Sequence, residues 1–491
     1  MFQIAQTQSH HYHTMLSDKL ISLLANLSKV ERNRFRKFLL SPYLNDQPDA
    51  IILFDLIDKE LRNSDTTEVT LSKQFVWSTL YPKIVFNDGH LRRLSSDLSQ
   101  LTLKFMVLES QNADPLQQAL DLQKALEKPQ LKKHLAGVER QLVRLLDSTE
   151  EQSSEFFMAQ YRMYHNVFYR ASKTVTTTGY GDKLEAADFH LECFYLIQKL
   201  KYYVAWLQFS GIRVAEKTVP LFPGFWEYLN QERFKTVPLI AIYRLIAKCF
   251  SEPQEEQHFR DLLEYLNKYS SKLTEENLRE CYHMAQNYCA LKINQGKTEY
   301  YSIYFELQKK VVQQGILLEN GQLSEGVFKN TITSGLRVGE FTWTEKFIED
   351  YYPFLPTSIR ENARTFNLAN LYSHQKQHDK VIELLNNVEY SDLVYALGAK
   401  LILLRTYYEK NEIMALDSLM DSFRIFIRRN KQMSKGLKRE YINFLNFLSK
   451  LSSISHRHSQ KLVLLKKSIM ENQQVTSKKW LLEKIDELEK K

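Results

Sequence analysis

Residues 324–430 decide the fold of this chain. They include SEGVFKNTITSGLRVGEFTWTEKFIEDYYPFLP (324–356), ENARTFNLANLYSHQKQHDKVIELLNNVEYSD (361–392) and LVYALGAKLILLRTYYEKNEIMALDSLMDSF (393–423). Each segment has apolar residues at helical spacing, then a short polar turn, then a second helical run. The pattern therefore predicts three helical hairpins laid end to end, which is typical of a helical repeat array.

The turns of these hairpins centre on Gly339, Lys376 and Asn411, which are 37 and 35 residues apart. In the first hairpin Phe341 follows the turn residue by two positions and Thr344 follows by five. This arrangement resembles the tetratricopeptide (TPR) repeat, whose period is about 34 residues. The other two turns match it more loosely.

The repeats depart from that consensus at particular positions. Lys376 replaces the usual turn glycine, and Leu404 stands where a small residue normally lets two helices approach. Gly296 is an earlier turn candidate, 43 residues before Gly339, and the loop 315–321 accounts for the extra length. We expect an all-α chain: an α-solenoid of stacked antiparallel, TPR-like helix pairs with an N-terminal helical cap domain.

Composition supports a helical, intracellular protein. The 491 residues include only 14 Gly and 11 Pro, whereas average usage would give roughly 34 and 25. The four cysteines form no C-x-x-C pair and are expected to be reduced, buried thiols. The sequence shows no signal peptide and no apolar run of about 20 residues, so we expect a cytoplasmic protein that does not engage a membrane.

The N-terminal part contains a tail and a first helical domain. Residues 1–14 hold His10, His11 and His13, which lack acidic or cysteine partners, so no metal site is expected. In the domain 15–111, Ser28 and Glu31 form a capping box that starts a helix. A helix-turn-helix that reads DNA through the LRRLSSDL stretch (91–98) is an alternative, but the preceding connection is too long for the usual turn and a leucine stripe favours a core helix.

A family resemblance appears in this domain. LSKVERNRFRKFLLSPYLN (27–45), TLYP (79–82) and FNDGHLRRLSSDLSQL (86–101) resemble the N-terminal signature of an uncharacterised family of bacterial helical proteins. That family continues into a helical-repeat region, whose C-terminal part resembles GEFTWTEKFIEDYYPFLP (339–356) and LMDSFRIFIRRNK (419–431) here. The resemblance implies a helical-repeat fold over most of the chain but no activity.

The remaining segments complete the predicted organisation. We expect long-helix hairpins, a linker or superhelix kink marked by three prolines, further helical hairpins, the TPR-like core and basic C-terminal helices. Their respective ranges are 112–218, 219–238, 239–323, 324–430 and 431–491.

Stacked hairpins create a concave face lined by first-helix side chains. The TPR register assigns seven residues to that face, and these are candidates for binding a peptide carboxylate or an acidic segment, or are ordinary solvated positions. They are Lys329, Thr333, Arg337, Phe366, Asn370, His374 and Arg405.

The second candidate surface is the basic C-terminal end. Residues 422–491 contain 17 Lys or Arg against 6 Asp or Glu, whereas the net charge of the whole chain is +8. Arg424, Arg428 and Arg429 share about one face of a helix. Such a cluster would bind nucleic acid phosphates or an acidic protein, or would simply keep the helices solvated.

No catalytic motif is present. The chain lacks H-E-x-x-H, G-x-S-x-G, a phosphate-binding loop and a dinucleotide fingerprint. His456 and His458 lie in an expected turn without carboxylates nearby. We therefore expect a non-enzymatic scaffold with no cofactor or metal, which binds a protein or peptide partner. The alternative is a regulatory factor that binds nucleic acid through its basic C-terminal helices.

Overall fold

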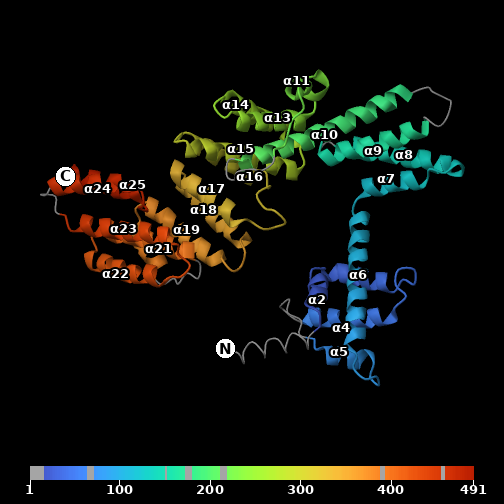
Figure 1. The fold of residues 1–491 in the computed structure, drawn as a ribbon, viewed down its shortest axis with the longest axis horizontal. Helices are drawn as coiled ribbons and strands as arrows, with labels where there is room; N and C mark the ends of the chain where they lie inside the picture. The colour runs from blue at the N-terminus through green and yellow to red at the C-terminus, as the bar shows by residue number, and fades with distance from the viewer. Residues whose placement is uncertain are drawn as a thin grey trace. The chain divides into compact units, whose positions relative to one another are not determined.

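The computed structural model describes residues 16–63, 71–149, 152–171, 180–210, 218–386, 393–454 and 459–490. These residues form 24 α-helices and three short 3-10 helices (Figure 1). The described part of the chain contains no β-strand, only an isolated bridge between Glu319 and Gln322. The prediction of an all-α chain is confirmed.

The chain divides into two compact units, and one long helix contributes to both. The first unit comprises residues 1–150 and 154–195, and the second comprises residues 151–153 and 196–491. Helices up to α10 begin in the first unit. They are Asp18–Ala25 (α2), Lys29–Leu39 (α3), Pro48–Asn63 (α4), Lys73–Leu80 (α5), Asp88–Asn112 (α6), Pro115–Ala125 (α7), Pro129–Leu131 (η1), Lys132–Asp147 (α8), Ser154–Ala171 (α9) and Tyr180–Ser210 (α10).

Helix α6 forms the centre of the N-terminal core, where α2, α3, α4 and α5 pack against it. Leu91, Leu94 and Leu98 are buried in this core, as the leucine stripe predicts. Phe105 continues the stripe and packs against Phe35 at a centroid distance of 5.2 Å. Helix α6, which would be the DNA-reading helix of the alternative helix-turn-helix, is thus a core helix over much of its length.

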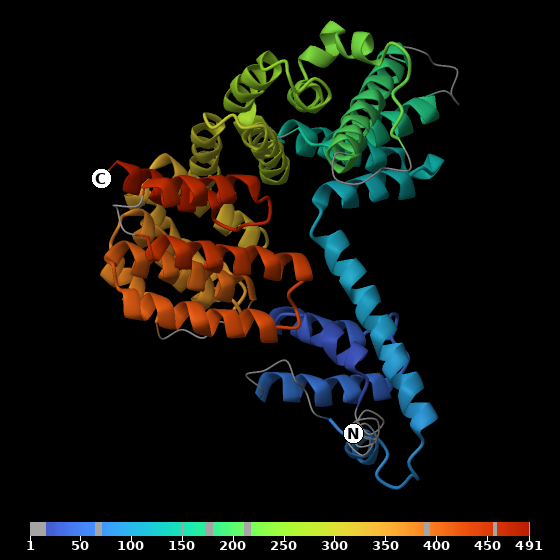
Figure 2. The same ribbon diagram turned by 60° about the vertical axis from the view of Figure 1, so that its left-hand side comes forward.

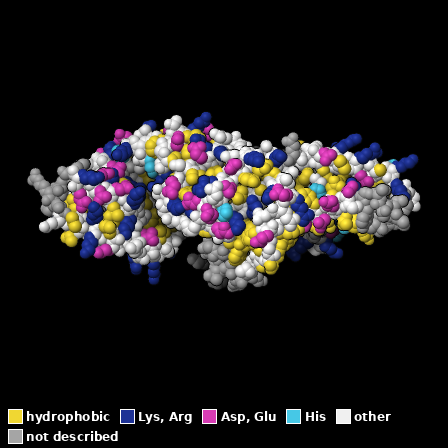
Figure 3. Space-filling view, turned by 90° about the horizontal axis from the view of Figure 1, so that it is seen from above, with side chains coloured by type: hydrophobic (Ala, Val, Ile, Leu, Met, Phe, Trp, Pro, Cys, Tyr) yellow, Lys and Arg dark blue, Asp and Glu magenta, His cyan; other side chains and the backbone are white. Residues whose placement is uncertain are grey.

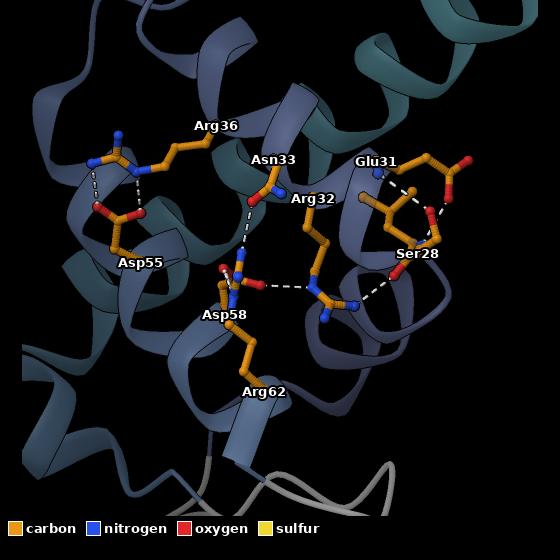
Figure 4. A network of polar contacts seen from close by, with 9 residues as sticks. Ser28, Glu31, Arg32, Asn33, Arg36, Asp55, Asp58 and Arg62 are labelled. Carbon is orange, nitrogen blue, oxygen red and sulfur yellow. Dashed lines mark hydrogen bonds and ion pairs between the residues drawn. The ribbon is translucent and has the colours of Figure 1, made fainter.

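Helices α3 and α4 are joined by a network of charged side chains (Figure 4). The predicted capping box at Ser28 is confirmed, with reciprocal bonds to Glu31. Arg32 Nε donates to Asp58 Oδ1 at 2.6 Å, and Arg36 makes two bonds to Asp55. Arg32 and Arg36 of α3 are therefore both paired with acids of α4.

The second unit begins within α10 and continues to the end of the chain. Its further helices are Phe225–Leu229 (α11), Glu232–Lys235 (α12), Pro238–Ser251 (α13), Gln257–Tyr269 (α14), Ser270–Lys272 (η2), Glu275–Asn294 (α15), Tyr300–Gln313 (α16), Glu325–Val338 (α17), Phe341–Tyr351 (α18), Tyr352–Phe354 (η3), Arg360–His374 (α19), His378–Leu385 (α20), Leu393–Lys410 (α21), Ile413–Arg429 (α22), Lys435–Ser452 (α23), Ser459–Glu471 (α24) and Lys478–Glu489 (α25).

The segment 219–238 differs from a simple linker. It contains the short helices α11 and α12, and the side chains of Phe225, Leu229 and Phe234 are buried. Gly224, with a φ of 78°, directly precedes α11, and Pro238 is the first residue of α13. The segment is therefore packed into the second unit.

The turns of the predicted hairpins share one backbone geometry. Gly296, Gly339, Lys376 and Asn411 all have left-handed φ angles, of 91°, 82°, 58° and 59° respectively. In each turn the next amide donates to the carbonyl five residues earlier, as from Glu340 N to the Gly335 oxygen at 3.0 Å. This bond satisfies a helix-end carbonyl while the chain reverses. The predicted turn positions are confirmed.

Helices α17 to α22 pair across these turns. Helix α17 contacts α18, α19 contacts α20 and α21 contacts α22, while the first helices are linked through contacts of α19 with α17 and α21. Gly398 on α21 makes room for the Phe366 ring on α19, because a Cβ there would lie 2.6 Å from that ring. Helices α22 to α25 lie side by side in Figure 2 and share a core that includes Phe423, Phe444 and Leu481.

Candidate partner-binding groove

Side chains from three first helices line a common depression in the second unit. Thr333 and Arg337 of α17, Asn370 and His374 of α19, and Arg405 of α21 all lie in its wall. Its volume is about 550 Å³. We call it the first-helix groove. Five of the seven residues that the repeat register assigned to a concave face thus come together.

The last helix of the chain forms the opposite wall of the first-helix groove. Ser477, at the start of α25, and Trp480 and Lys484 within it lie there. Trp480 Nε1 donates to Glu409 Oε1 of α21 at 3.0 Å, and Lys484 Nζ lies 2.9 Å from the same oxygen. Side chains more than 70 residues apart in the sequence therefore build one site.

The carboxylates of the first-helix groove are held by lysines of α25. Burial favours the neutral form of Glu409, but the bonds from Lys484 and Trp480 outweigh it and lower the pKa of Glu409. Glu487 lies 3.0 Å from Lys484, and Glu483 lies 3.8 Å from Lys479. All three acids are therefore already paired with a lysine.

Three cations of the groove have no such partner. Within the described ranges, no carboxylate lies within ion-pair distance of Arg337, Lys376 or Arg405. Arg337 lies over the Tyr301 ring, 5.9 Å from its centroid. Arg337 and Lys376 are exposed. The groove consequently offers three cations without a direct ion pair among the described residues, although the charges of Glu409 and Glu483 act on Arg405.

Arg405 is the most enclosed of these cations. Burial lowers the pKa of its guanidinium, which nevertheless stays charged because an arginine pKa starts above 12. One Nη donates to Ser477 Oγ, and the guanidinium carbon lies 5.7 Å from the centre of the Trp480 ring. Its Nε–H is buried without an acceptor. Arg405 is thus preorganised and retains one unsatisfied donor.

The polar residues beside these cations are locally ordered. His374 Nδ1 donates to the Asn370 carbonyl oxygen of the preceding turn at 2.9 Å, which fixes the imidazole on α19. Asn370 is half-buried and Thr333 is exposed. They add hydrogen-bonding capacity between the cations.

Two of the predicted concave residues lie elsewhere. Lys329 is exposed on α17 and does not line the first-helix groove. Phe366 packs between helices, against Gly398 and with its ring centroid 5.3 Å from that of Tyr395. Both residues lie on first helices, as the register predicts, but Phe366 packs between helices and does not line the groove.

The sequence register missed the α25 side of the site. Trp480 and Lys484 follow the last turn that matches the repeat, so no spacing relates them to Arg405. The available signals that α25 docks on another element were the indole of Trp480 and the leucines and isoleucine at helical spacing in KKWLLEKIDELEK (478–490).

The basic C-terminal end forms a separate surface. Arg424 is paired with Asp421 at 2.9 Å, whereas Arg428 and Arg429 are exposed at the end of α22. Lys431 in the connection to α23 and Lys435, the first residue of α23, are also exposed. None of these last four cations has an ion-pair partner among the described residues. Elsewhere, as on the face seen in Figure 3, Lys and Arg side chains are interspersed with Asp and Glu.

Among the described residues, the remaining candidates from the sequence form no site. All four cysteines are buried, and no disulfide joins any two of them. No three His, Cys, Asp or Glu side chains within the described ranges are arranged to hold a metal ion. His10, His11, His13, His456 and His458 lie outside the described residues. No described helix combines the length and apolar character needed to cross a bilayer.

Comparison with known proteins adds no assignment. No protein-family model matches the chain, and no curated protein or solved structure is significantly similar to it. The function must therefore be argued from the chain itself.

Proposed function

We propose that the protein is a non-enzymatic, TPR-like helical scaffold that binds an acidic segment of a protein partner in the first-helix groove. The observation that supports this most directly is the group of three cations, Arg337, Lys376 and Arg405, around a groove whose carboxylates are already paired. An incoming carboxylate would meet ordered donors with little rearrangement. We also propose that the helix pairs α17 to α22 form part of an α-solenoid, which their repeated turn geometry favours.

Charge reversal within the groove tests this proposal. Arg337 and Lys376 are exposed, so the double variant Arg337→Glu with Lys376→Glu is expected to fold normally. Lys329→Glu is a control for a single charge reversal, because it reverses an exposed cation on α17 outside the groove. Full-length wild type and both variants are used as bait in extracts of the native host, and captured proteins are identified by mass spectrometry.

The expected result is a partner with an acidic segment that wild type and Lys329→Glu retain and the double variant loses. Binding of the corresponding synthetic peptide, measured by fluorescence anisotropy, should follow the same order and persist at about 150 mM salt, where charges separated by more than about 8 Å are screened. A partner set that the double variant captures unchanged would refute the proposal.

Binding of nucleic acid through the basic end is a second candidate. It is supported by the four exposed cations of Arg428, Arg429, Lys431 and Lys435, which lack ion-pair partners in the described structure. Retention on heparin or RNA that disappears at moderate salt and in Arg428→Glu with Arg429→Glu would favour it. Equal retention of wild type and this variant would eliminate it.

A further inference from the structure

A second groove lies in the first unit, between α8 and α9. Its floor is apolar and consists of Val143 on α8 and Met163, Tyr164 and Val167 on α9. Its volume is about 500 Å³. We call it the α8–α9 groove. It belongs to a different unit from the first-helix groove and shares no residue with it.

On α8, the apolar part of the α8–α9 groove comes from a valine outside the buried stripe. Leu135, Val138, Leu142 and Leu146 form the buried stripe. Val143 lies outside that stripe and is 43% exposed. A valine held at this exposure on a regular helix leaves apolar surface available for contact with another molecule.

The α9 wall of this groove is rigid. The Tyr164 ring stacks on the His190 ring of α10, with centroids 5.5 Å apart and planes 5° apart. Met163 is buried. The floor is thus a prepared surface, which lowers the conformational entropy that a ligand would have to remove.

Positive charge surrounds this floor. Arg140 and Arg144 of α8 and Lys183 of α10 line the groove, and none has an ion-pair partner in the described parts of the chain. Lys183 Nζ lies 5.5 Å from the centre of the Tyr164 ring. The only acid in the lining, Glu139, is bound by Arg170.

The neighbouring arginines of α9, by contrast, do have acidic partners. Arg162 on α9 contacts Asp121, and Arg170 contacts Glu127 as well as Glu139. The chain thus supplies acids to the arginines that join α9 to α7 and α8. Among the described residues, no acid lies within ion-pair distance of the three cations that border the apolar floor.

We infer that the α8–α9 groove docks an amphipathic helix of a partner protein, with apolar residues against the floor and acidic residues toward Arg140, Arg144 and Lys183. Helix α8 has 16 residues and is therefore about 24 Å long. A helix of three to four turns beside it would place apolar residues at positions i, i+3 or i+4, and i+7 on the floor.

An unbiased selection tests this inference. A yeast-displayed library of randomised 16-residue amphipathic helices is sorted for binding to the full-length wild-type protein. Selected clones are then tested against Val143→Asp, Arg140→Gln with Arg144→Gln, and the control Val107→Asp. Val107 is 58% exposed on α6 in the same unit but outside the groove, so it matches the change in surface charge.

The selected helices are expected to carry an excess of Asp and Glu beside an apolar stripe. Val143→Asp should weaken their binding about tenfold or more, because a carboxylate would face both the apolar stripe and the acidic residues. Loss of both arginines should weaken it roughly two- to tenfold, and Val107→Asp should leave it unchanged. Circular dichroism spectra and melting curves of the variants establish that they are folded.

Three outcomes would overturn the inference: no clone that depends on Val143, clones that depend on Val143 but carry basic flanks, or clones equally affected by Val107→Asp. Clones that lose binding only with Lys376→Glu would belong to the first-helix groove. The two proposals therefore succeed or fail separately.

Discussion

Gly335 provides the sharpest test of how the repeat helices pack. It lies on α17, directly opposite Thr344 on α18, and a Cβ at this position would overlap Thr344 Oγ1. Thr344 is fully buried, and its hydroxyl donates to the Glu340 carbonyl oxygen at 2.7 Å. The hydroxyl therefore has little freedom to move away, and Gly335→Ala should force α17 and α18 apart.

The expected magnitude follows from two opposing effects. Overpacking of a core costs about 1–3 kcal/mol, whereas alanine in place of a mid-helix glycine stabilises a helix by about 0.5–1 kcal/mol. Gly335→Ala should therefore destabilise the α17–α18 pair by about 1–2 kcal/mol. Thr344→Ala alone removes a hydrogen bond and some contact area, at about 0.5–1.5 kcal/mol.

Combining the two substitutions should reverse most of the loss. Without the hydroxyl, the new methyl group would lie 3.4 Å from the Cβ of residue 344 and 3.2 Å from the Phe305 ring, distances that small shifts accommodate. The double variant should therefore be more stable than the sum of the single changes predicts, with a coupling free energy of about 1–3 kcal/mol.

Local hydrogen exchange is the appropriate assay, because a chain with two compact units is not expected to unfold in one step. Amide exchange of peptides from α17 and α18 is followed by mass spectrometry in the full-length protein, and a tenfold rate change corresponds to about 1.4 kcal/mol. Gly326→Ala is the control on the same helix, since a Cβ there meets no atom within 4 Å. It should be neutral or slightly stabilising.

The steric explanation would be refuted by additive effects of Gly335→Ala and Thr344→Ala. It would also be refuted if Gly335→Ala behaved like Gly326→Ala.

Three further predictions concern stability. Asp58→Ala should destabilise the N-terminal domain by about 3 kcal/mol, because it leaves the largely buried Arg32 without its carboxylate partner. An unchanged rate of amide hydrogen exchange in α3 would contradict this prediction. Lys376→Gly should stabilise the α19–α20 turn by up to about 1 kcal/mol, because lysine is strained at a left-handed φ. Asn411→Gly should stabilise the α21–α22 turn by less, since asparagine tolerates left-handed φ. Equal effects of the two substitutions on local hydrogen exchange would be inconsistent with backbone strain. Burial lowers the pKa of His190 to about 4, so as the pH falls this histidine is protonated in the unfolded chain before it is protonated in the folded one. The contribution of His190 to the free energy of unfolding should therefore be fully present above about pH 6.5. It should fall by about 1 kcal/mol, allowing for solvent screening, as the pH drops toward 4. His190→Phe should lack this part of the pH dependence in thermal melts.

Local signals determined much of this protein. The turns at Gly339, Lys376 and Asn411 could be predicted because each depends on one left-handed residue and on a hydrogen bond between residues five apart. A short stretch of sequence is therefore enough to predict such interactions. The helical period likewise groups Arg337 and Asn370 on corresponding helix faces, because residues on one face of a helix recur at fixed intervals, and both line the first-helix groove.

Tertiary packing decided the rest. Whether Phe366 faced solvent or filled the space above Gly398 depended on the distance between α19 and α21. The sequence also contained Trp480, but not its position beside Arg405, since the contact of α25 with α21 depends on how the intervening helices stack. Helix starts, turns and faces follow from interactions within a few residues, whereas the walls of the grooves and the unpaired cations in them follow from which distant helices meet.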